Sequence, residues 1–592
     1  MFFNFVEDNA MKNDIVVRFV GSAGDGLVSI GELFGKILKK HNFNVLGFRS
    51  YQSVIRGGYN TYQIRASQEK VLTVGEEADI IVLLNKHVAE IHREVVHSGA
   101  RIIYDNEDFS LDELKYPPDI VKLPIPLKAI TKEITTLKVV RNVVGFGAIA
   151  YLLGLNMELI EEVLKEQFQR KGEKVVEINV LALKKGYEYA EKENWSPIWE
   201  KQDYKKSTQM LLSGNDAIAL GLLAGGLKFY SGYPITPASS IIHYLTKHLP
   251  KLGIIVKQTE DEIAAVGMAI GAAYCGVRAA TGTSGAGFSL MSEMIGMAAM
   301  EEIPLVVINS QRVGPSTGMA TKTEQGDLFQ ALGVSQGEFP KIIIAPSDVE
   351  DAFQSGIEAL ELAEKYQTVV IVLMDLYLSE QIASVKRLPL KRKNKRYGIL
   401  SEVKGEYRRF VITPNGVSPR TLPGTKNGMY HTTSSEHQED GSSIASTLAG
   451  LPRTLEIRKA MVQKRMRKLE YVLKELPPPK LEGKKDADIT LISWGSTKNI
   501  VAEAVIKLNE IGLRANHLHI KYVSPLHVDV INDLLKNSKI LIAVELNYEG
   551  QMRKYLRMEA GLNIPYLINR YDGEPITSSE IVMKVKEIVQ NE

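Results

Sequence analysis

Buried-strand patterns alternate with helical patterns along most of this chain. The first apolar run, 15–20, is followed by a glycine-rich turn at 21–26 and then by a helical pattern through Leu38. Short apolar runs separated by helical periodicity are typical of a mostly parallel sheet with helices on its faces. The same alternation predicts further strands at 45–48, 80–84 and 101–104.

The alternation restarts twice. After a helix that is rich in alanine, leucine and glycine and begins near Gly214, strands are predicted at 228–230, 254–257, 278–281, 305–309, 341–344 and 368–374. A third series is predicted at 489–495, 514–520 and 539–545. We therefore expect an α/β protein with three doubly wound parallel-sheet domains.

Turn signals and loop-rich stretches mark the expected boundaries between these domains. A Ser-Pro turn at 196–197 is followed by a charged stretch to Lys206, and a loop-rich segment after 385 ends in a basic helix and three prolines at 477–479. The expected organisation is a first domain at 1–198, a second at 207–385, a connecting segment at 386–485 and a third domain at 486–592.

Composition narrows the function classes. The 592 residues carry a net charge of +2, with 44% hydrophobic and 24% charged residues, so neither nucleic acid nor a membrane is indicated as a partner. The apolar run at 368–374 is too short to span a bilayer, and acids among the first eight residues argue against a secretory signal. A cytoplasmic location is expected.

Cys275 is the only cysteine. One cysteine excludes an intrachain disulfide, and it also excludes a four-cysteine zinc or iron–sulfur site built by this chain alone. We expect Cys275 to be a small core residue on a glycine-containing helix.

Polar side chains follow several predicted strands of the second domain. Thr236 lies in a turn that two prolines stiffen, Glu262 begins a helix, Ser284 lies in a hydroxyl-rich loop, and Arg312 follows a buried strand. Because ligands of open parallel sheets bind beyond the carboxyl ends of the strands, these four groups should converge on one edge. The alternatives are that Thr236 only caps the next helix and that Glu262 only complements a helix dipole.

Two other candidate sites are weaker. The turn Gly21–Gly26 could hold a phosphate, but its glycine spacing departs from the dinucleotide fingerprint, and a close-packed strand-to-helix turn is the alternative. Its Gly-Asp-Gly lacks the paired asparagines of a thiamine diphosphate magnesium site. The cluster His431, Glu436, His437, Glu439 and Asp440 has no regular ligand spacing and is interpreted as a polar loop, so no metal site is expected in this chain.

The motifs of the second domain resemble the pyrimidine-type domain of the 2-oxoacid:ferredoxin oxidoreductases. The resemblance rests on the turn Tyr233, Pro234, Ile235, Thr236 and Pro237, on the Glu262 helix, on 281–287 and on 312–328. Residues 544–551 resemble the transketolase C-terminal-like domain of that family, and 56–60 with 21–26 resemble its gamma domain. Together these resemblances imply a fused gamma-alpha subunit whose connecting segment is 386–485.

The resemblance implies CoA-dependent oxidative decarboxylation of a 2-oxoacid to acyl-CoA and CO₂, with electrons passed to ferredoxin. Thr236 and Arg312 would bind the substrate, Thr321 is a further substrate contact, and Glu262 would activate thiamine diphosphate, with Glu260 as the nearby alternative. The cofactor would be shared with a beta subunit that brings Mg²⁺ and a 4Fe–4S cluster, which makes the enzyme a heterodimer that is active only when assembled.

Two alternatives and one question of specificity stay open at this point. A self-contained transketolase-type enzyme would need a magnesium motif that we do not find, and a nucleotide-binding or regulatory subunit would leave the second domain catalytically silent. Broad specificity that includes 2-oxoglutarate and pyruvate is favoured. A second cation for a dicarboxylate could come from Arg49, Arg56 or Lys322.

Overall fold

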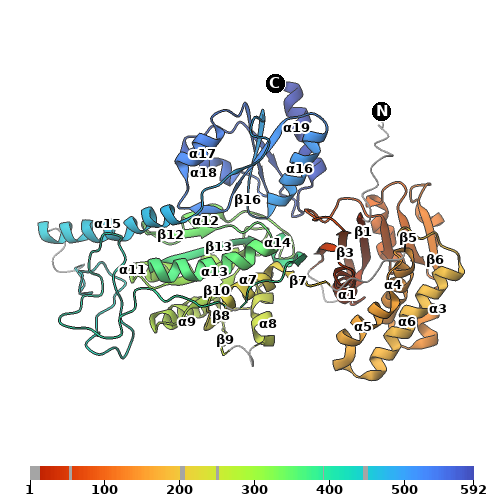
Figure 1. The fold of residues 1–592 in the computed structure, drawn as a ribbon, viewed down its shortest axis with the longest axis horizontal. Coiled ribbons are helices and arrows are strands. Elements are labelled where there is room, and N and C mark those ends of the chain that lie inside the picture. Colours follow the sequence, from red (N-terminus) through yellow and green to blue (C-terminus); the bar gives the residue numbers. More distant parts are fainter. Residues whose placement is uncertain (1–13, 53–56, 201–206, 249–252, 391, 445–450) are drawn as a thin grey trace. The chain divides into compact units, whose positions relative to one another are not determined.

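The computed structural model describes residues 14–592 apart from 53–56, 201–206, 249–252, 391 and 445–450, and the chain divides into two units (Figure 1). Unit 1 comprises Met1–Leu212 and Gln381–Leu388, and unit 2 comprises Ser213–Glu380 and Pro389–Glu592. The amino-terminal residues 1–8 and Arg56 lie outside the described residues. The α/β class is confirmed, whereas the four domain boundaries stay predictions.

Unit 1 is built on a sheet with strand order β6-β5-β4-β1-β3-β2-β14-β7. Strands β1, β4, β5 and β6 are parallel, whereas β3 and β2 continue beyond β1 as antiparallel strands. β3 escaped prediction because buried polar residues such as Asn60 and Gln63 interrupt its apolar pattern. The strands are β1 (Asp14–Ala23), β2 (Asn44–Ser50), β3 (Gly57–Ser67), β4 (Ile80–Leu83), β5 (Arg101–Asp105), β6 (Val121–Ile125), β7 (Met210–Ser213) and β14 (Ile382–Val385).

Helices cover the sheet of unit 1, and two of them touch through glycines. A Cβ on Gly147 of α4 would lie 2.1 Å from the carbonyl oxygen of Leu183, and one on Gly186 of α6 would lie 1.9 Å from that of Val144. Only glycine permits this approach of the two backbones. The helices are α1 (Leu27–Lys40), α2 (Lys86–His92), α3 (Leu127–Ile134), α4 (Arg141–Leu152), α5 (Met157–Phe168) and α6 (Glu173–Lys192).

The first sheet of unit 2 contains all six strands predicted for the second domain. Its order is β18-β12-β13-β11-β10-β8-β9, and every pair is parallel except the edge pair β12 and β18. β11 and β13 are buried along their whole length, as a central strand between two helical layers must be. The strands are β8 (Phe229–Gly232), β9 (Ile255–Gln258), β10 (Ala279–Thr283), β11 (Leu305–Gln311), β12 (Lys341–Ile344), β13 (Val369–Asp375) and β18 (Tyr522–Ser524).

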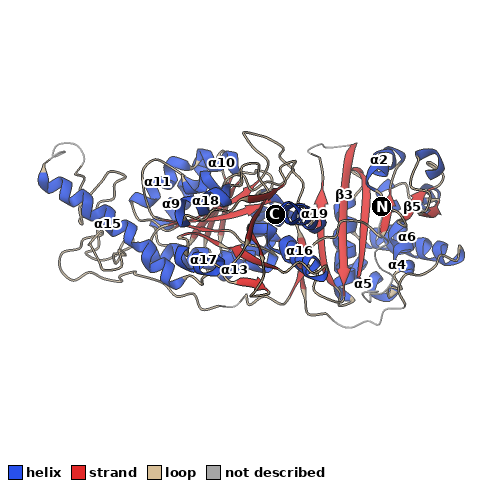
Figure 2. Ribbon diagram, turned by 90° about the horizontal axis from the view of Figure 1, so that it is seen from above, coloured by secondary structure: helices blue, strands red, loops and turns tan. Residues whose placement is uncertain are grey.

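Helices lie on both faces of this sheet (Figure 2). α7 and α13 pack so closely that a Cβ on Gly221 would lie 2.0 Å from the carbonyl oxygen of Phe353. The helices are α7 (Gly214–Ala224), α8 (Ser239–His248), α9 (Glu262–Tyr274), α10 (Gly285–Leu290), α11 (Ser292–Met300), α12 (Leu328–Leu332), α13 (Val349–Tyr366) and α14 (Leu376–Glu380).

The second sheet of unit 2 has the order β15-β17-β16-β19-β20 and contains the three strands predicted at the carboxyl end. Apolar residues of its strands join the core of the first sheet, including Trp494 and Leu518. The elements are β15 (Leu481–Gly483), β16 (Ile489–Trp494), β17 (Ala515–Ile520), β19 (Ile540–Glu545), β20 (Tyr566–Asn569), α16 (Lys498–Glu510), α17 (Val528–Leu535), α18 (Gln551–Ala560) and α19 (Ser578–Asn591).

The predicted basic helix is α15 (Pro452–Glu475), which extends beyond the first sheet in Figures 1 and 2. Two of its lysines, Lys464 and Lys468, are buried and form ion pairs with the buried carboxylate of Glu302. Arg465 pairs with Glu436 of the loop-rich segment at 2.9 Å. Paired buried charges therefore fix this helix to α11 and to the loops around it.

Candidate functional site

The turn Tyr233–Pro237 follows β8 and is held by a side chain of the neighbouring helix α7. Its Thr236–Pro237 peptide is cis, and the buried side chain of Asn215 on α7 donates a hydrogen bond to the carbonyl oxygen of Pro237 at 2.8 Å. Thr236 is half-buried, and its hydroxyl makes no hydrogen bond with another described residue. The turn therefore presents a hydroxyl that is available to a ligand.

Arg312 leaves the end of β11 and reaches this turn. Its Nη1 donates a hydrogen bond to the carbonyl oxygen of Thr236 at 2.8 Å. Burial lowers the pKa of the guanidinium, as expected for a half-buried cation without a carboxylate partner. The structure thus brings Thr236 and Arg312 together, as the positions of their strand ends predicted.

Thr321 lies in the loop that begins at Arg312. The loop is closed by hydrogen bonds from the Val313 N–H to the Lys322 oxygen, at 3.1 Å, and from the Gly314 N–H to the Glu324 carboxylate, at 3.0 Å. Thr321 is half-buried and does not line the pocket described below. Thr321 therefore belongs to the loop that Arg312 begins, but it is not part of the pocket lining.

Glu262 is the first residue of α9 and is only 6% exposed. Its carboxylate lies against the turn after β10, because a Cβ added to Gly287 would meet Glu262 Oε1 at 2.5 Å and Thr283 Oγ1 at 2.1 Å. The carboxylate has no hydrogen-bond partner among the described residues, and the α9 cap is supplied by Asp261 instead. Glu260 is exposed, so the structure favours Glu262 over Glu260 as the buried acid.

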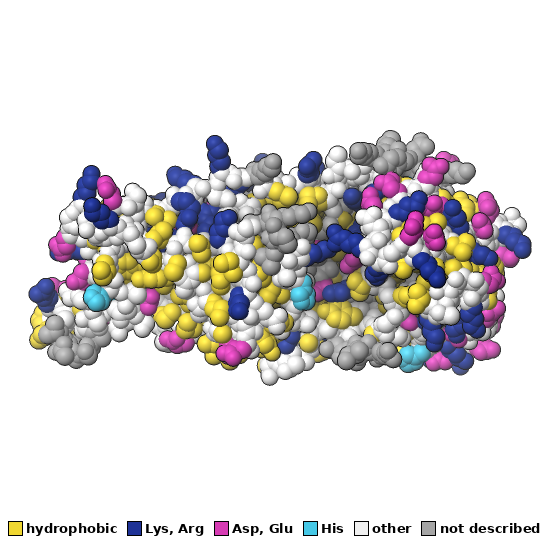
Figure 3. All heavy atoms as spheres, turned by 90° about the horizontal axis from the view of Figure 1, so that it is seen from below, with side chains coloured by type: hydrophobic (Ala, Val, Ile, Leu, Met, Phe, Trp, Pro, Cys, Tyr) yellow, Lys and Arg dark blue, Asp and Glu magenta, His cyan; other side chains and the backbone are white. Residues whose placement is uncertain are grey.

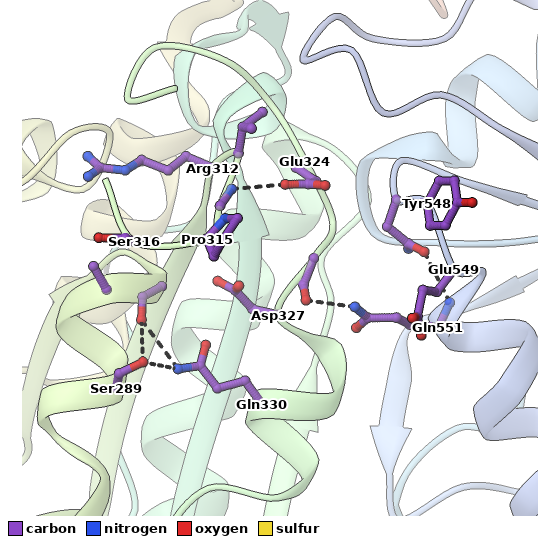
Figure 4. Close-up of a pocket in the computed structure, with 16 residues that line it drawn as sticks. Ser289, Arg312, Pro315, Ser316, Glu324, Asp327, Gln330, Tyr548, Glu549 and Gln551 are labelled. Atoms are coloured by element: carbon purple, nitrogen blue, oxygen red, sulfur yellow. Dashed lines mark hydrogen bonds between the residues drawn. The ribbon is translucent and has the colours of Figure 1, made fainter. Parts of the chain in front are cut away.

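A pocket of about 590 Å³ opens beside Arg312 (Figure 4). Its walls come from the Arg312 loop, from α10, from the segment 324–330 and from the loop that precedes α18. Thr236 and Glu262 border this region through Arg312 and Gly287 but do not line the pocket itself. Sequence reasoning assigned no role to Glu324, Asp327, Gln330 or Glu549, which do line it.

Gln325 fixes one wall of the pocket to the second sheet. Its backbone N–H donates to the Leu546 oxygen at 2.7 Å, its Oε1 accepts from the Leu546 N–H at 3.1 Å, and its Nε2 donates to the Trp494 oxygen at 2.9 Å. Gln551 of α18 adds a hydrogen bond to the Gly326 oxygen at 2.8 Å. A single sequence does not show that a glutamine inside a motif will be buried and hydrogen-bonded to another sheet.

The glycine-rich turn of unit 1 is held by the side chain of one of its own residues, Asp25. The carboxylate of Asp25 accepts hydrogen bonds from the Ser22 N–H at 2.8 Å and from Asn85 at 3.0 Å, and it pairs with Arg141 at 2.9 Å. A phosphate in this turn would therefore have to displace a bound carboxylate. The geometry supports the close-packed turn rather than a nucleotide site.

Other sequence candidates are engaged elsewhere or lie outside the pocket. The ring of His437 contacts the ring of Phe410 at a centroid distance of 4.0 Å, and Glu436 binds Arg465; among the described residues, no group of three potential metal ligands is found. The expectation for Cys275 was wrong: it is exposed, because it follows the last turn of α9. Lys322 is ion-paired with Glu574, and neither Lys322 nor Arg49 lines the pocket.

Comparison with known proteins bears on this arrangement. Residues 220–451 match the family model described as pyruvate flavodoxin/ferredoxin oxidoreductase, thiamine diphosphate-binding, and residues 16–189 match the model for pyruvate ferredoxin/flavodoxin oxidoreductase. The 2-oxoacid:ferredoxin oxidoreductase 2 alpha subunit of Aeropyrum pernix is 31% identical, and the alignment covers 98% of each chain. The chain belongs to the alpha subunits of the 2-oxoacid:ferredoxin oxidoreductases.

Further relatives agree. The 2-oxoglutarate oxidoreductase subunit KorA of Mycobacterium tuberculosis is 30% identical, over 94% of this chain and 88% of its own. The solved structure of 2-oxoglutarate:ferredoxin oxidoreductase from Magnetococcus marinus, with 2-oxoglutarate, coenzyme A and succinyl-CoA bound, has a TM-score of 0.90 and 34% identity, and the match covers 98% of this chain and 100% of that one.

The family resolves the alternatives left by the sequence. The chain is an oxidoreductase subunit that acts on 2-oxoacids, not a regulatory nucleotide-binding subunit, and it carries the family's thiamine diphosphate-binding domain. The name alpha subunit implies further subunits. Among the described residues, each helix is too short or too polar to cross a bilayer.

Proposed function

We propose that Arg312 and Thr236 bind the carboxylate and keto group of the 2-oxoacid and that Thr321 is a further substrate contact. The observation that carries the proposal is the hydrogen bond of Arg312 to the Thr236 turn, which leaves the rest of the guanidinium at the wall of a pocket. A planar guanidinium offers paired donors to a carboxylate. The Thr236 hydroxyl supplies one more donor beside it.

Glu262 fits the binding of thiamine diphosphate. It is a buried carboxylate for which no hydrogen bond from another described residue is found, so it can accept a hydrogen bond from a ligand donor. Glu262 would hold the aminopyrimidine ring by accepting a hydrogen bond. When bound, thiamine diphosphate supplies the carbanion and the electron sink for decarboxylation. From its buried place against the turn after β10, Glu262 would orient the ring.

A beta subunit would supply what this chain lacks. The single cysteine of the sequence cannot bind a 4Fe–4S cluster, so the cluster and the Mg²⁺ of the diphosphate are assigned to the partner. Exposed apolar residues of unit 2 include Ile255, Ile263 and Met268 on β9 and α9, and Figure 3 shows hydrophobic side chains gathered between scattered charges. Such a surface suits a subunit interface. Coenzyme A and ferredoxin are the expected co-substrates.

The charges that line the pocket bear on which 2-oxoacids it can bind without help from a partner subunit. Among its described lining residues Arg312 is the single cation, whereas Glu324, Asp327 and Glu549 are acidic. A second carboxylate, as in 2-oxoglutarate, would then need a cation from the partner subunit. We propose broad specificity that includes pyruvate and 2-oxoglutarate, and the ratio of kcat/KM for these two acids on the assembled enzyme measures it.

Substitution of Arg312 in the assembled enzyme tests the substrate site. Arg312→Ala should raise the KM for the 2-oxoacid roughly 10- to 100-fold, because a hydrogen bond to a charged group contributes about 1.5–3 kcal/mol. Arg312→Lys should recover only part of this loss, since a lysine cannot form the paired contact. Asp533→Asn alters an exposed carboxylate of α17 that does not line the pocket and serves as a charge control. An unchanged KM in Arg312→Ala contradicts the proposal.

A further inference from the structure

Asp327 is a carboxyl group of the pocket to which the proposed substrate contacts assign no role. It directly precedes α12, and its backbone N–H donates a hydrogen bond to Oε1 of Gln311 at 3.0 Å. Its side chain receives a hydrogen bond from Nδ2 of Asn309 at 2.9 Å. The acceptor Gln311 and the donor Asn309 both belong to the buried end of β11, so the position of Asp327 is set by the same strand that delivers Arg312.

The carboxyl group of Asp327 packs closely against Gly285 on one side. A Cβ added to Gly285 would lie 2.6 Å from Asp327 Oδ2, a distance that real Cβ atoms do not show. Figure 4 shows Asp327 at the pocket between the Arg312 loop and Gln330. Asp327 therefore occupies a fixed place in the wall of the pocket that Arg312 also lines.

Several polar atoms at this place have no partner among the described residues. Oδ1 of Asn309 and Oγ of Ser284 are buried, and neither makes a hydrogen bond. Asp327 itself is half-buried, and its Oδ2 accepts the hydrogen bond from Asn309. Buried polar groups without partners are rare in native proteins and indicate a water or a ligand.

The charge of the substrate constrains the state of this carboxyl group. Arg312 and Thr236 would bring an anion into the pocket, and the other titratable groups that line it are the carboxylates of Glu324 and Glu549 and the phenol of Tyr548. An ionised Asp327 would repel the substrate, whereas a neutral carboxyl group could donate a hydrogen bond to it. Burial raises the pKa of Asp327, and the hydrogen bond from Asn309 opposes this only in part.

We propose that Asp327 is a further substrate-contacting residue, which carries its proton when the 2-oxoacid is bound and donates a hydrogen bond to an oxygen of that acid. The inference rests on the proposed function of Arg312 and Thr236. Because the protonated form of Asp327 binds the substrate, the affinity for the 2-oxoacid is highest at low pH and falls as the pH rises through the raised pKa of Asp327.

Binding of unreactive substrate isosteres to the assembled enzyme tests the inference. Oxamate replaces pyruvate, N-oxalylglycine replaces 2-oxoglutarate, and calorimetry gives their Kd from acidic to alkaline pH. Asp327→Ala should weaken binding about tenfold at low pH, as the loss of one hydrogen bond predicts. Asp327→Asn keeps the shape and a donor, so it should bind tightly and lose the pH dependence. Asp533→Asn, on the exposed surface of α17, should behave as the wild type.

The outcomes separate this inference from the proposed function. If Arg312→Ala weakens binding but Asp327→Ala does not, the inference is wrong and the substrate site stands. If Asp327→Asn keeps the wild-type pH dependence, another group carries the proton and the inference is likewise wrong. If Arg312→Ala leaves the Kd of both isosteres unchanged, the proposed substrate site itself fails. Thermal unfolding of each variant checks that it is folded, and Asp327→Asn tests the proton even where Asp327→Ala is unstable.

Discussion

Gly287→Ala should disable the site through Glu262. A Cβ at this position would lie 2.1 Å from Thr283 Oγ1 and 2.5 Å from Glu262 Oε1, where real Cβ atoms stay beyond 3.0 Å. The threonine oxygen must therefore retreat by about 0.9 Å and the carboxylate oxygen by about 0.5 Å. Misplacement of a reacting group by about 1 Å costs on the order of 100-fold in rate. We expect kcat to fall between 10- and 100-fold and the Kd of thiamine diphosphate to rise.

Steady-state kinetics and calorimetric titration with thiamine diphosphate measure the two effects in the assembled enzyme. Gly145→Ala is the control, because Gly145 lies in α4 of unit 1 and a Cβ there meets only the side chains of Val82 at 3.5 Å and Leu127 at 3.8 Å, which are ordinary contacts. It should leave both constants unchanged and raise the stability of α4 by roughly 0.5–1 kcal/mol. If Gly287→Ala is folded and shows the wild-type kcat and Kd, then Glu262 does not contact the cofactor.

Two further predictions concern unit 2. Burial raises the pKa of Asp375 from 3.8 to about 6, so folding favours its protonated form and the stability gained at low pH, roughly 3 kcal/mol, is lost as the pH rises from 3.8 to about 6. Asp375→Asn should remove this decline in Tm. Glu302→Gln should destabilise the chain by about 3–5 kcal/mol, because it leaves Lys464 and Lys468 buried without a carboxylate. Glu475→Gln breaks an exposed pair instead and should change Tm little.

Apolar periodicity was enough to place the parallel strands. β11 and β13 are continuous apolar runs that end in polar residues, and such strands are buried on both faces whatever surrounds them. β3 was missed because its burial depends on hydrogen bonds of Asn60 and Gln63 to residues elsewhere in the sheet region. Polar side chains of this kind are buried because residues distant in sequence form hydrogen bonds with them. The pattern of apolar residues along the chain carries no information about such partners.

The same limit applies to the site. The proximity of Arg312 and Thr236 could be predicted from the sequence, because each residue follows a parallel strand and the carboxyl ends of parallel strands lie at one edge of the sheet. Cys275 was misplaced because helix composition does not tell which end of α9 meets solvent. Asp327 and Gln325 lie in a segment without strand or helix periodicity, so their places depend on contacts with β11 and with the second sheet.

Because of these contacts, the shape of the pocket depends on both sheets of unit 2. The first sheet supplies Arg312, but the loop after it returns through Thr323, whose N–H bonds to the Gly573 oxygen at 3.0 Å, and through Gln325, which bonds to Leu546 and Trp494. The loop that contains Thr321 is thus held at its far end by the carboxyl-terminal sheet. Because a group misplaced by about 1 Å loses much of its effect, we expect the second sheet to be needed to position the proposed substrate-binding loop, even though none of its residues is among the proposed substrate contacts.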